Sequence, residues 1–285
     1  MTARIQRRDI VVDGLRLHVA EAGAGPALFL VHGLTASHAV WQPTIEAFAD
    51  RWHVIAPDLP GHGESAKPDA PYTIDFFAGM MRSLARTLDV REAVVCGSSL
   101  GGRVALELAL WYPAFTRALV LAAPAVGYSI AMRPVGQALQ ALTGPRILRA
   151  SLERFFQQNF HDRTRIGHVA RRRILEERLM APDFSDFARA VARSLAGVLR
   201  SEPQPIEHVT QPALVVWGRQ DRLVPLRRSR TLLRRIPHAR LHVLERCGHL
   251  PMLEQPGAFN RVVAEFLRTA SAAPRHRPRH VAGVA

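Results

Sequence analysis

The sequence has 285 residues, of which 48% are hydrophobic. A chain of this length and composition buries enough apolar surface to fold, which excludes a disordered or fibrous protein. Its formal net charge of +14 comes almost entirely from arginine, since Lys67 is the only lysine. The basic segments show little of the aromatic interleaving that stacks bases, so we expect a solvated basic surface and no nucleic-acid partner.

Neither end of the chain shows a targeting or membrane signal. Three arginines lie within the first eight residues, but no apolar segment follows them, so a secretory signal peptide is not expected. The longest apolar stretch, 118–132, is interrupted by Pro124 and Gly127 and is too short to span a bilayer. We therefore expect a cytoplasmic protein without stable membrane insertion, while its oligomeric state is left open.

The two cysteines are too few for a disulfide framework, and the sequence contains no Cys or Cys/His cluster with metal-ligand spacing. Cys96 and Cys247 both lie near residues proposed below as catalytic, so a bridge between them is one alternative. We expect two buried free thiols instead, and neither a metal nor another cofactor.

The first predicted elements are strands. Segments 9–12 and 15–21 flank Asp13-Gly14, a pattern typical of a hairpin with a two-residue turn. The continuous apolar run 27–31 fits a strand that is covered on both faces. A further strand at 53–56 ends in Pro57-Asp58 and opens a glycine-rich loop.

Helix and strand patterns then alternate. Thr73 is a candidate N-cap for a helix over 74–88, which is followed by a strand at 93–96. A helix over 101–111 and a strand over 118–122 complete this part. Such alternation predicts an α/β protein with a mostly parallel central sheet flanked by helices.

The alternation stops between residues 127 and 205, where the sequence is helical in pattern and rich in arginine. We interpret 127–205 as a helical lid inserted into a core formed by 1–126 and 206–269, with a flexible basic tail over 270–285. Core patterning resumes with strands at 213–217 and 240–244 and a helix at about 257–269. Apolar lid residues are expected to pack and in part to line an acyl pocket; these are Leu139, Leu142, Ile147, Leu148, Leu152, Phe155 and Phe156.

One motif lies between a short apolar strand and a helix. Gly97-Ser98-Ser99-Leu100-Gly101 has the form Gly-x-Ser-x-Gly, and Gly102 follows it. A nucleophile on a sharp strand-to-helix turn needs small neighbours, and the helix N-terminus offers main-chain amides to developing negative charge. Ser99, and not Ser98, has glycine two positions away on each side, so Ser99 is the candidate nucleophile; an idle serine in a glycine-rich turn is the alternative.

With three further motifs, the chain resembles the α/β-hydrolase superfamily, in its lidded serine esterase-like and haloperoxidase-like branch. The resemblance covers about 10–267 and rests on the Ser99 motif together with His32-Gly33-Leu34, 58–65 (DLPGHGES), and the segments around Asp221 and His249. It implies an oxyanion hole formed by the main-chain N–H groups of Leu34 and Leu100. Donors of this kind typically lower the barrier by about 3 to 4 kcal/mol each.

The candidate acid and base follow the last two predicted strands. Asp221 follows the strand 213–217, and His249 lies 28 residues further on, past the strand 240–244. Catalytic groups in such sheets gather at the carboxyl ends of strands, and the order Ser, Asp, His is the order expected of this fold. The alternatives are that Asp221 caps the next helix or pairs with Arg222, and that His249 is an ordinary loop histidine.

A serine at position 99 favours acyl transfer over the chemistry of related epoxide hydrolases and dehalogenases, which place an aspartate there. We expect a carboxylic ester hydrolase acting on small-molecule esters with apolar acyl or alcohol groups. A carbon–carbon bond hydrolase of the same fold is the runner-up, although those enzymes commonly have tryptophan where this chain has Leu250. A non-catalytic binding protein is the third reading, and His32, His62 and Glu254 are expected to be scaffold residues.

Overall fold

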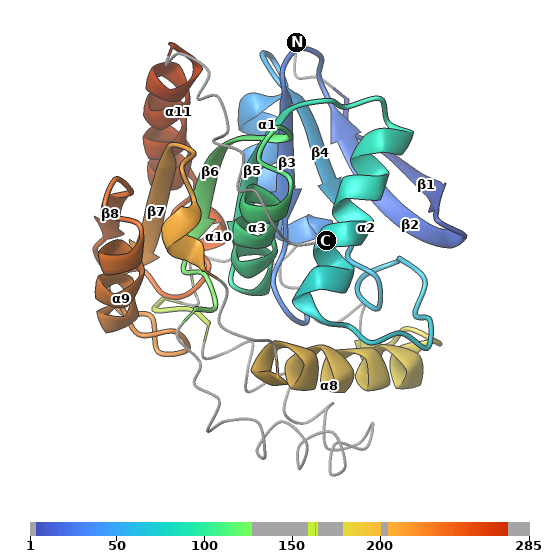
Figure 1. The fold of residues 1–285 in the computed structure, drawn as a ribbon. Helices are drawn as coiled ribbons and strands as arrows, with labels where there is room; N and C mark the ends of the chain where they lie inside the picture. The colour runs from blue at the N-terminus through green and yellow to red at the C-terminus, as the bar shows by residue number, and fades with distance from the viewer. Residues whose placement is uncertain (1–3, 127–158, 163, 165–178, 201–204, 273–285) are drawn as a thin grey trace.

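The structure is a computed structural model that describes residues 4–126, 159–162, 164, 179–200 and 205–272. Its described part contains an eight-stranded sheet with helices on both faces (Figure 1). The strands are β1 (Gln6–Val12), β2 (Leu15–Ala22), β3 (Ala27–Val31), β4 (His53–Pro57), β5 (Ala93–Ser98), β6 (Thr116–Ala122), β7 (Ala213–Gly218) and β8 (Arg240–Leu244). The helices are η1 (His38–Trp41), α1 (Gln42–Phe48), α2 (Ile74–Thr87), α3 (Leu100–Trp111), α8 (Phe184–Arg200), η5 (Ile206–His208), α9 (Arg227–Arg235), α10 (Pro251–Glu254) and α11 (Pro256–Ala272).

The strands follow the order β1-β2-β4-β3-β5-β6-β7-β8 across the sheet. β1 and β2 pair antiparallel, as do β2 and β4, and every other neighbouring pair is parallel. The carboxyl ends of β5, β6, β7 and β8 therefore lie along one edge. This topology confirms the predicted fold class and brings the loops after β5, β7 and β8 together.

The N-terminal hairpin has the predicted two-residue turn. Val12 pairs with Leu15, and both turn residues have positive φ, 47° at Asp13 and 78° at Gly14. Two consecutive residues with positive φ are the geometry of a type I′ turn, whose twist matches that of the flanking strands. The Asp-Gly dipeptide was thus sufficient to place this turn.

The central strands are buried on both faces, as the apolar run 27–31 predicted. Phe29 and Val31 of β3 pack with α2 and α3, whereas Leu28 and Leu30 pack on the other face with α1 and α11. Alternate residues of a strand point to opposite faces, so both faces need apolar side chains here. This double packing gives the loops at the strand ends a rigid base.

The sequence predicted the starts of helices better than it predicted short helices. Thr73 caps α2, and its hydroxyl oxygen accepts from the N–H of Phe76 at 3.3 Å. The helices η1, α1, α9 and α10 were not predicted. α9 reads RRSRTLLRR and buries only Ser229 and Leu232, so its apolar stripe is too narrow to give a periodic signal.

The predicted lid is described only in part. Residues 127–158, 163, 165–178 and 201–204 lie outside the described residues, as do the seven apolar lid residues named above and the tail from 273 onward. α8 is described and lies across one end of the sheet (Figure 1). It packs on the loop after β4 through the Lys67–Asp183 ion pair at 2.7 Å and the Arg193–Asp69 ion pair.

Candidate active site

Ser99 lies at the sharp turn between β5 and α3. Its φ of 52° and ψ of −114° are a conformation that non-glycine residues rarely adopt. Two main-chain hydrogen bonds hold the turn: the N–H of Ser99 donates to Ala122 O at 3.0 Å, and Ala125 N–H donates to Ser99 O at 2.9 Å. The strained backbone projects the side chain from the turn, the arrangement expected of a nucleophile elbow.

The glycines of the motif are required by close backbone contacts. A Cβ added at Gly101 would overlap the carbonyl oxygens of Val31 and His32, and one added at Gly97 would overlap the main chain of Gly101. These overlaps involve main-chain atoms, which cannot move aside as a flexible side chain can. Small residues at both positions are therefore what allows α3 to begin directly against β3 and β5.

Asp221 follows β7 and is fully buried, with 0% of its side chain exposed. Its Oδ1 accepts from the N–H groups of Leu223 at 2.9 Å and Val224 at 2.8 Å, while Oδ2 lies 2.7 Å from Nδ1 of His249. Among the described residues Asp221 forms no ion pair with Arg222. It closes the turn before α9 and at the same time points its second oxygen at the histidine.

His249 lies on the loop after β8, and its N–H donates to Asn159 O at 2.6 Å. An ionised carboxylate only accepts, so Nδ1 must carry the proton that bonds Asp221, and a neutral ring then presents an acceptor lone pair at Nε2. Nε2 is buried and has no hydrogen-bond partner among the described residues. The structure thus joins Asp221 to His249, but it shows no hydrogen bond between Nε2 and Ser99.

The two main-chain N–H groups expected in the oxyanion hole lie beside the nucleophile. No described residue accepts a hydrogen bond from the N–H of Leu34 or of Leu100. Gly33 approaches the elbow so closely that a Cβ there would lie 3.1 Å from Ser99 Cβ. Both amides are therefore available to an oxyanion formed at Ser99.

His32 holds this loop in place. Its Nε2 accepts from the N–H of Leu59 at 2.9 Å, so Nδ1 carries the proton and donates to Gly33 O at 2.8 Å. Burial lowers the pKa of His32, which keeps the ring neutral in this bridging role. The scaffold role expected of His32 agrees with these contacts.

Asp58, at the start of the loop after β4, organises that loop, and the sequence analysis assigned it no role. Its Oδ1 accepts from the N–H of His38 at 2.6 Å and lies 3.0 Å from His38 Nδ1, while Oδ2 accepts from the N–H of Glu64 at 2.8 Å. Burial alone would raise the pKa of Asp58, but the bonds and charge of His38 outweigh it and lower the pKa to about 2. An acidic residue opening a glycine-rich loop was the available signal.

His62 is also buried in this loop. Its ring packs edge-on against Phe77 of α2 and Phe187 of α8, with ring centroids 6.1 and 6.2 Å apart. Burial lowers its pKa to about 3, so the ring is neutral near pH 7. These contacts fit the expected scaffold role and connect α8 to the core.

With this geometry described, comparison with known proteins identifies the family. The model of the alpha/beta hydrolase family matches residues 28–262, which include Ser99, Asp221 and His249. The chain belongs to the alpha/beta hydrolase family. The superfamily resemblance noted in the sequence is thereby confirmed.

This alpha/beta hydrolase is similar to enzymes with different substrates. It is 32% identical to 2-hydroxymuconate semialdehyde hydrolase of Pseudomonas sp. (strain CF600), over 93% of this chain and 95% of that protein. It is 30% identical to pimeloyl-[acyl-carrier protein] methyl ester esterase of Nitrosomonas europaea, over 85% and 96% respectively. The solved structure of a thermophilic esterase from Thermogutta terrifontis superposes with a TM-score of 0.80 at 26% identity, covering 93% of this chain and 99% of that one.

The described part of the hydrolase gives no sign of a metal or membrane role. No group of three His, Cys, Asp or Glu side chains within it is placed to hold a metal ion. No helix within it has the length and apolar character needed to cross a bilayer. Cys96 and Cys247 are both buried free thiols, as expected.

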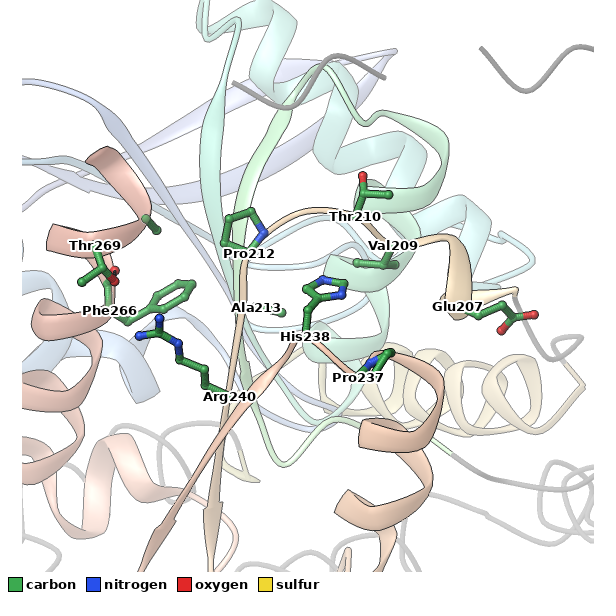
Figure 2. Close-up of a pocket in the computed structure, with 11 residues that line it drawn as sticks. Glu207, Val209, Thr210, Pro212, Ala213, Pro237, His238, Arg240, Phe266 and Thr269 are labelled. Carbon is green, nitrogen blue, oxygen red and sulfur yellow. Dashed lines mark hydrogen bonds between the residues drawn. The ribbon is translucent and has the colours of Figure 1, made fainter. Parts of the chain in front are cut away.

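A pocket of about 610 Å³ lies away from the candidate active site. Figure 2 shows His238 and Arg240 at this pocket, with Phe266 and Thr269 of α11 beside them. Ala213 and Arg240, which line it, begin β7 and β8, whereas Asp221 and His249 follow the carboxyl ends of those strands. It is therefore at the opposite end of the strands and is not the acyl site.

Proposed function

We propose that this alpha/beta hydrolase acts on small-molecule carboxylic esters with apolar acyl or alcohol groups, through an acyl-enzyme on Ser99. The observation that carries the proposal is the buried Asp221–His249 pair, whose tautomer leaves an acceptor lone pair at Nε2. Serine hydrolases need such a base beside a hydroxyl on a strained elbow, and Ser99 supplies that hydroxyl.

The reaction then follows from the side chains present. The Ser99 hydroxyl attacks the ester carbonyl carbon while Nε2 of His249 takes its proton, and the carbonyl oxygen becomes an oxyanion bound by the N–H groups of Leu34 and Leu100. Collapse breaks the bond to the alcohol, which leaves with the proton from His249. A water molecule, activated by the same nitrogen, hydrolyses the acyl-enzyme and restores Ser99.

Asp221 supports both protonation states of the histidine. Its Oδ2 accepts the Nδ1 proton throughout, and the carboxylate charge stabilises the imidazolium that forms transiently. The Nε2–Ser99 hydrogen bond, which is not formed in the structure, is a contact that in many hydrolases tightens when substrate binds. We further propose that the insertion 127–205, of which α8 is a part, serves as the lid of this site.

Carbon–carbon bond hydrolysis is a second candidate because relatives of the chain include both meta-cleavage product hydrolases and esterases. The two activities are separated by their substrates. Purified protein is assayed with p-nitrophenyl esters of increasing acyl length and, in parallel, with 2-hydroxymuconate semialdehyde, and each assay is repeated with Ser99→Ala.

The proposal expects ester turnover that favours short-to-medium apolar acyl groups and is abolished in Ser99→Ala. Faster turnover of the semialdehyde would replace it with the carbon–carbon reading. Inertness toward both substrate classes, or ester turnover that survives in Ser99→Ala, would contradict serine catalysis of either kind.

A further inference from the structure

Glu254, the last residue of α10, carries a buried carboxylate that binds main-chain amides. It is 3% exposed, and it accepts three hydrogen bonds. Oε2 accepts from Gly248 N–H at 2.9 Å and from His161 N–H at 3.0 Å, and Oε1 accepts from Asp162 N–H at 3.0 Å. No described lysine or arginine pairs with it, so these amides replace the water that burial removes.

The three donors come from two separate parts of the chain. Gly248 directly precedes His249, while His161 and Asp162 belong to the insertion 127–205, nearly 90 residues away along the sequence. The same two segments also meet directly, because His249 N–H donates to Asn159 O at 2.6 Å. Glu254 therefore fastens residues 159–162 to the loop of the candidate base.

The contact between these segments leaves no room for adjustment at Gly248. A Cβ on Gly248 would overlap the carbonyl oxygen of Asn159 and would lie 2.7 Å from His161 N. The backbone on both sides of the His249 Cα is thus fixed by 159–162 and by Glu254. The only side-chain restraint on the ring is the bond from Nδ1 to Asp221.

We propose that Glu254 is a positioning residue for the hydrolytic reaction, which rests on the proposed function of Ser99 and His249. By binding Gly248 and the segment 159–162 at once, Glu254 sets the main-chain position from which His249 presents Nε2. Asp221 fixes the ring from the opposite side. Loss of the Glu254 carboxylate leaves the Asp221 bond intact but lets the loop shift, and a displacement of about 1 Å in a reacting group can cost about 10²-fold in rate.

The test compares Glu254→Gln with wild type and with Glu245→Gln. Glutamine keeps the size of the side chain, but its amide group turns an N–H toward a main-chain N–H and so loses at least one of the three bonds. Glu245 is exposed and pairs with exposed Arg219, so Glu245→Gln removes a carboxylate from the adjacent loop without touching the site. Active sites are counted by titration with a fluorophosphonate, and kcat per titrated site is measured on a p-nitrophenyl ester well below the melting temperature.

A positioning role predicts that Glu254→Gln keeps its titratable sites but loses 10- to 100-fold in kcat per site, with KM changed less than twofold. Glu245→Gln should match wild type. A Glu254→Gln protein with the wild-type kcat per site overturns the proposal. So does a loss of activity caused only by fewer titratable sites, because that is the behaviour of a residue that merely stabilises the fold.

A second variant keeps the test decisive if Glu254→Gln does not fold. His161→Pro deletes one N–H donor to Glu254 and leaves the carboxylate in place. It should also lower kcat per site, and in the double variant the two losses should be less than additive because both act on the same bond. Unchanged kcat per site in His161→Pro would contradict the proposal. Wild type that does not react with the fluorophosphonate contradicts the proposed function itself, which separates the two failures.

Discussion

Oδ2 of Asp221 lies 2.7 Å from Nδ1 of His249, while Oδ1 of the same carboxylate is held by two main-chain N–H groups. The carboxylate therefore cannot rotate without losing these bonds, and it dictates which nitrogen of the imidazole carries the proton. Replacing Asp221 by asparagine puts an N–H donor within reach of Nδ1 and favours the opposite tautomer, in which Nε2 is protonated and cannot act as a base.

We accordingly expect Asp221→Asn to lower kcat for ester hydrolysis by about 10⁴-fold, with little change in KM. The neighbouring exposed Arg222 offers a matched control, and Arg222→Gln should keep the wild-type kcat. Steady-state kinetics on a p-nitrophenyl ester measure both variants. If Asp221→Asn retains more than about a tenth of wild-type kcat, Asp221 does not orient the base.

Gly33 tests the oxyanion loop. A Cβ at this position would lie 3.1 Å from Ser99 Cβ and 3.3 Å from Ser98 O, distances that force a small displacement. We expect Gly33→Ala to slow fluorophosphonate labelling by about 10- to 100-fold. The melting temperature should fall by only a few degrees, since the contact is tight without being impossible. Labelling at the wild-type rate would show that the loop does not constrain the nucleophile.

Asp58 tests the loop after β4. Because the folded-state pKa of about 2 lies below the ordinary value of 3.8, Asp58 stabilises the fold fully above about pH 4, and this contribution is lost as the pH falls toward 2. Asp58→Asn should lower the free energy of unfolding by about 2 to 3 kcal/mol at pH 7. Urea titrations at pH 7 and at pH 2.5 should show a smaller difference between variant and wild type at the lower pH. An equal difference at both would argue against an ionised Asp58.

Glu107 of α3 predicts the opposite pH dependence. Burial, reinforced by the nearby Asp75 carboxyl group, raises the pKa of Glu107 to about 7, against an ordinary value of 4.5. The folded state therefore holds the proton more tightly than the unfolded state, and stability falls as the pH rises from about 4.5 to 7. Glu107→Gln keeps the bond from Trp111 and removes the ionisation.

The expected result is that Glu107→Gln is more stable than wild type by roughly 1 to 3 kcal/mol at pH 8.5 and of similar stability at pH 5. Urea unfolding at the two pH values measures this difference. Glu92→Gln is a control on the exposed surface, where a carboxylate pairs with Arg117. A Glu107→Gln protein that loses stability at pH 8.5 would show that the charged carboxylate is favourable in the fold.

The sequence was enough to predict the sheet and the order of its main elements. Apolar runs such as 27–31 are diagnostic because both sheet faces are covered, and Asp13-Gly14 defines a turn by local conformation alone. Short helices escaped prediction because helices such as α9 bury only one or two side chains and thus carry no periodic pattern.

The site was predictable only where its chemistry is local. Ser99 is signalled by the glycines on either side, and Asp221 and His249 by their positions after strands. The contacts of His249 with Asn159, and of Glu254 with His161, join segments about 90 residues apart through main-chain atoms. Every residue type has an N–H and, apart from the side chain, the same C=O, so such contacts leave no mark on residue identity.

The most direct test of the central claim is covalent labelling with a fluorophosphonate, followed by intact-mass measurement and peptide mapping. Trypsin releases 92–103, which contains both Ser98 and Ser99, so the two serines are separated by variants. The account predicts one adduct per chain on this peptide, retained in Ser98→Ala and absent in Ser99→Ala. Labelling that persists in Ser99→Ala, or a folded wild-type protein that takes up no label, would contradict it.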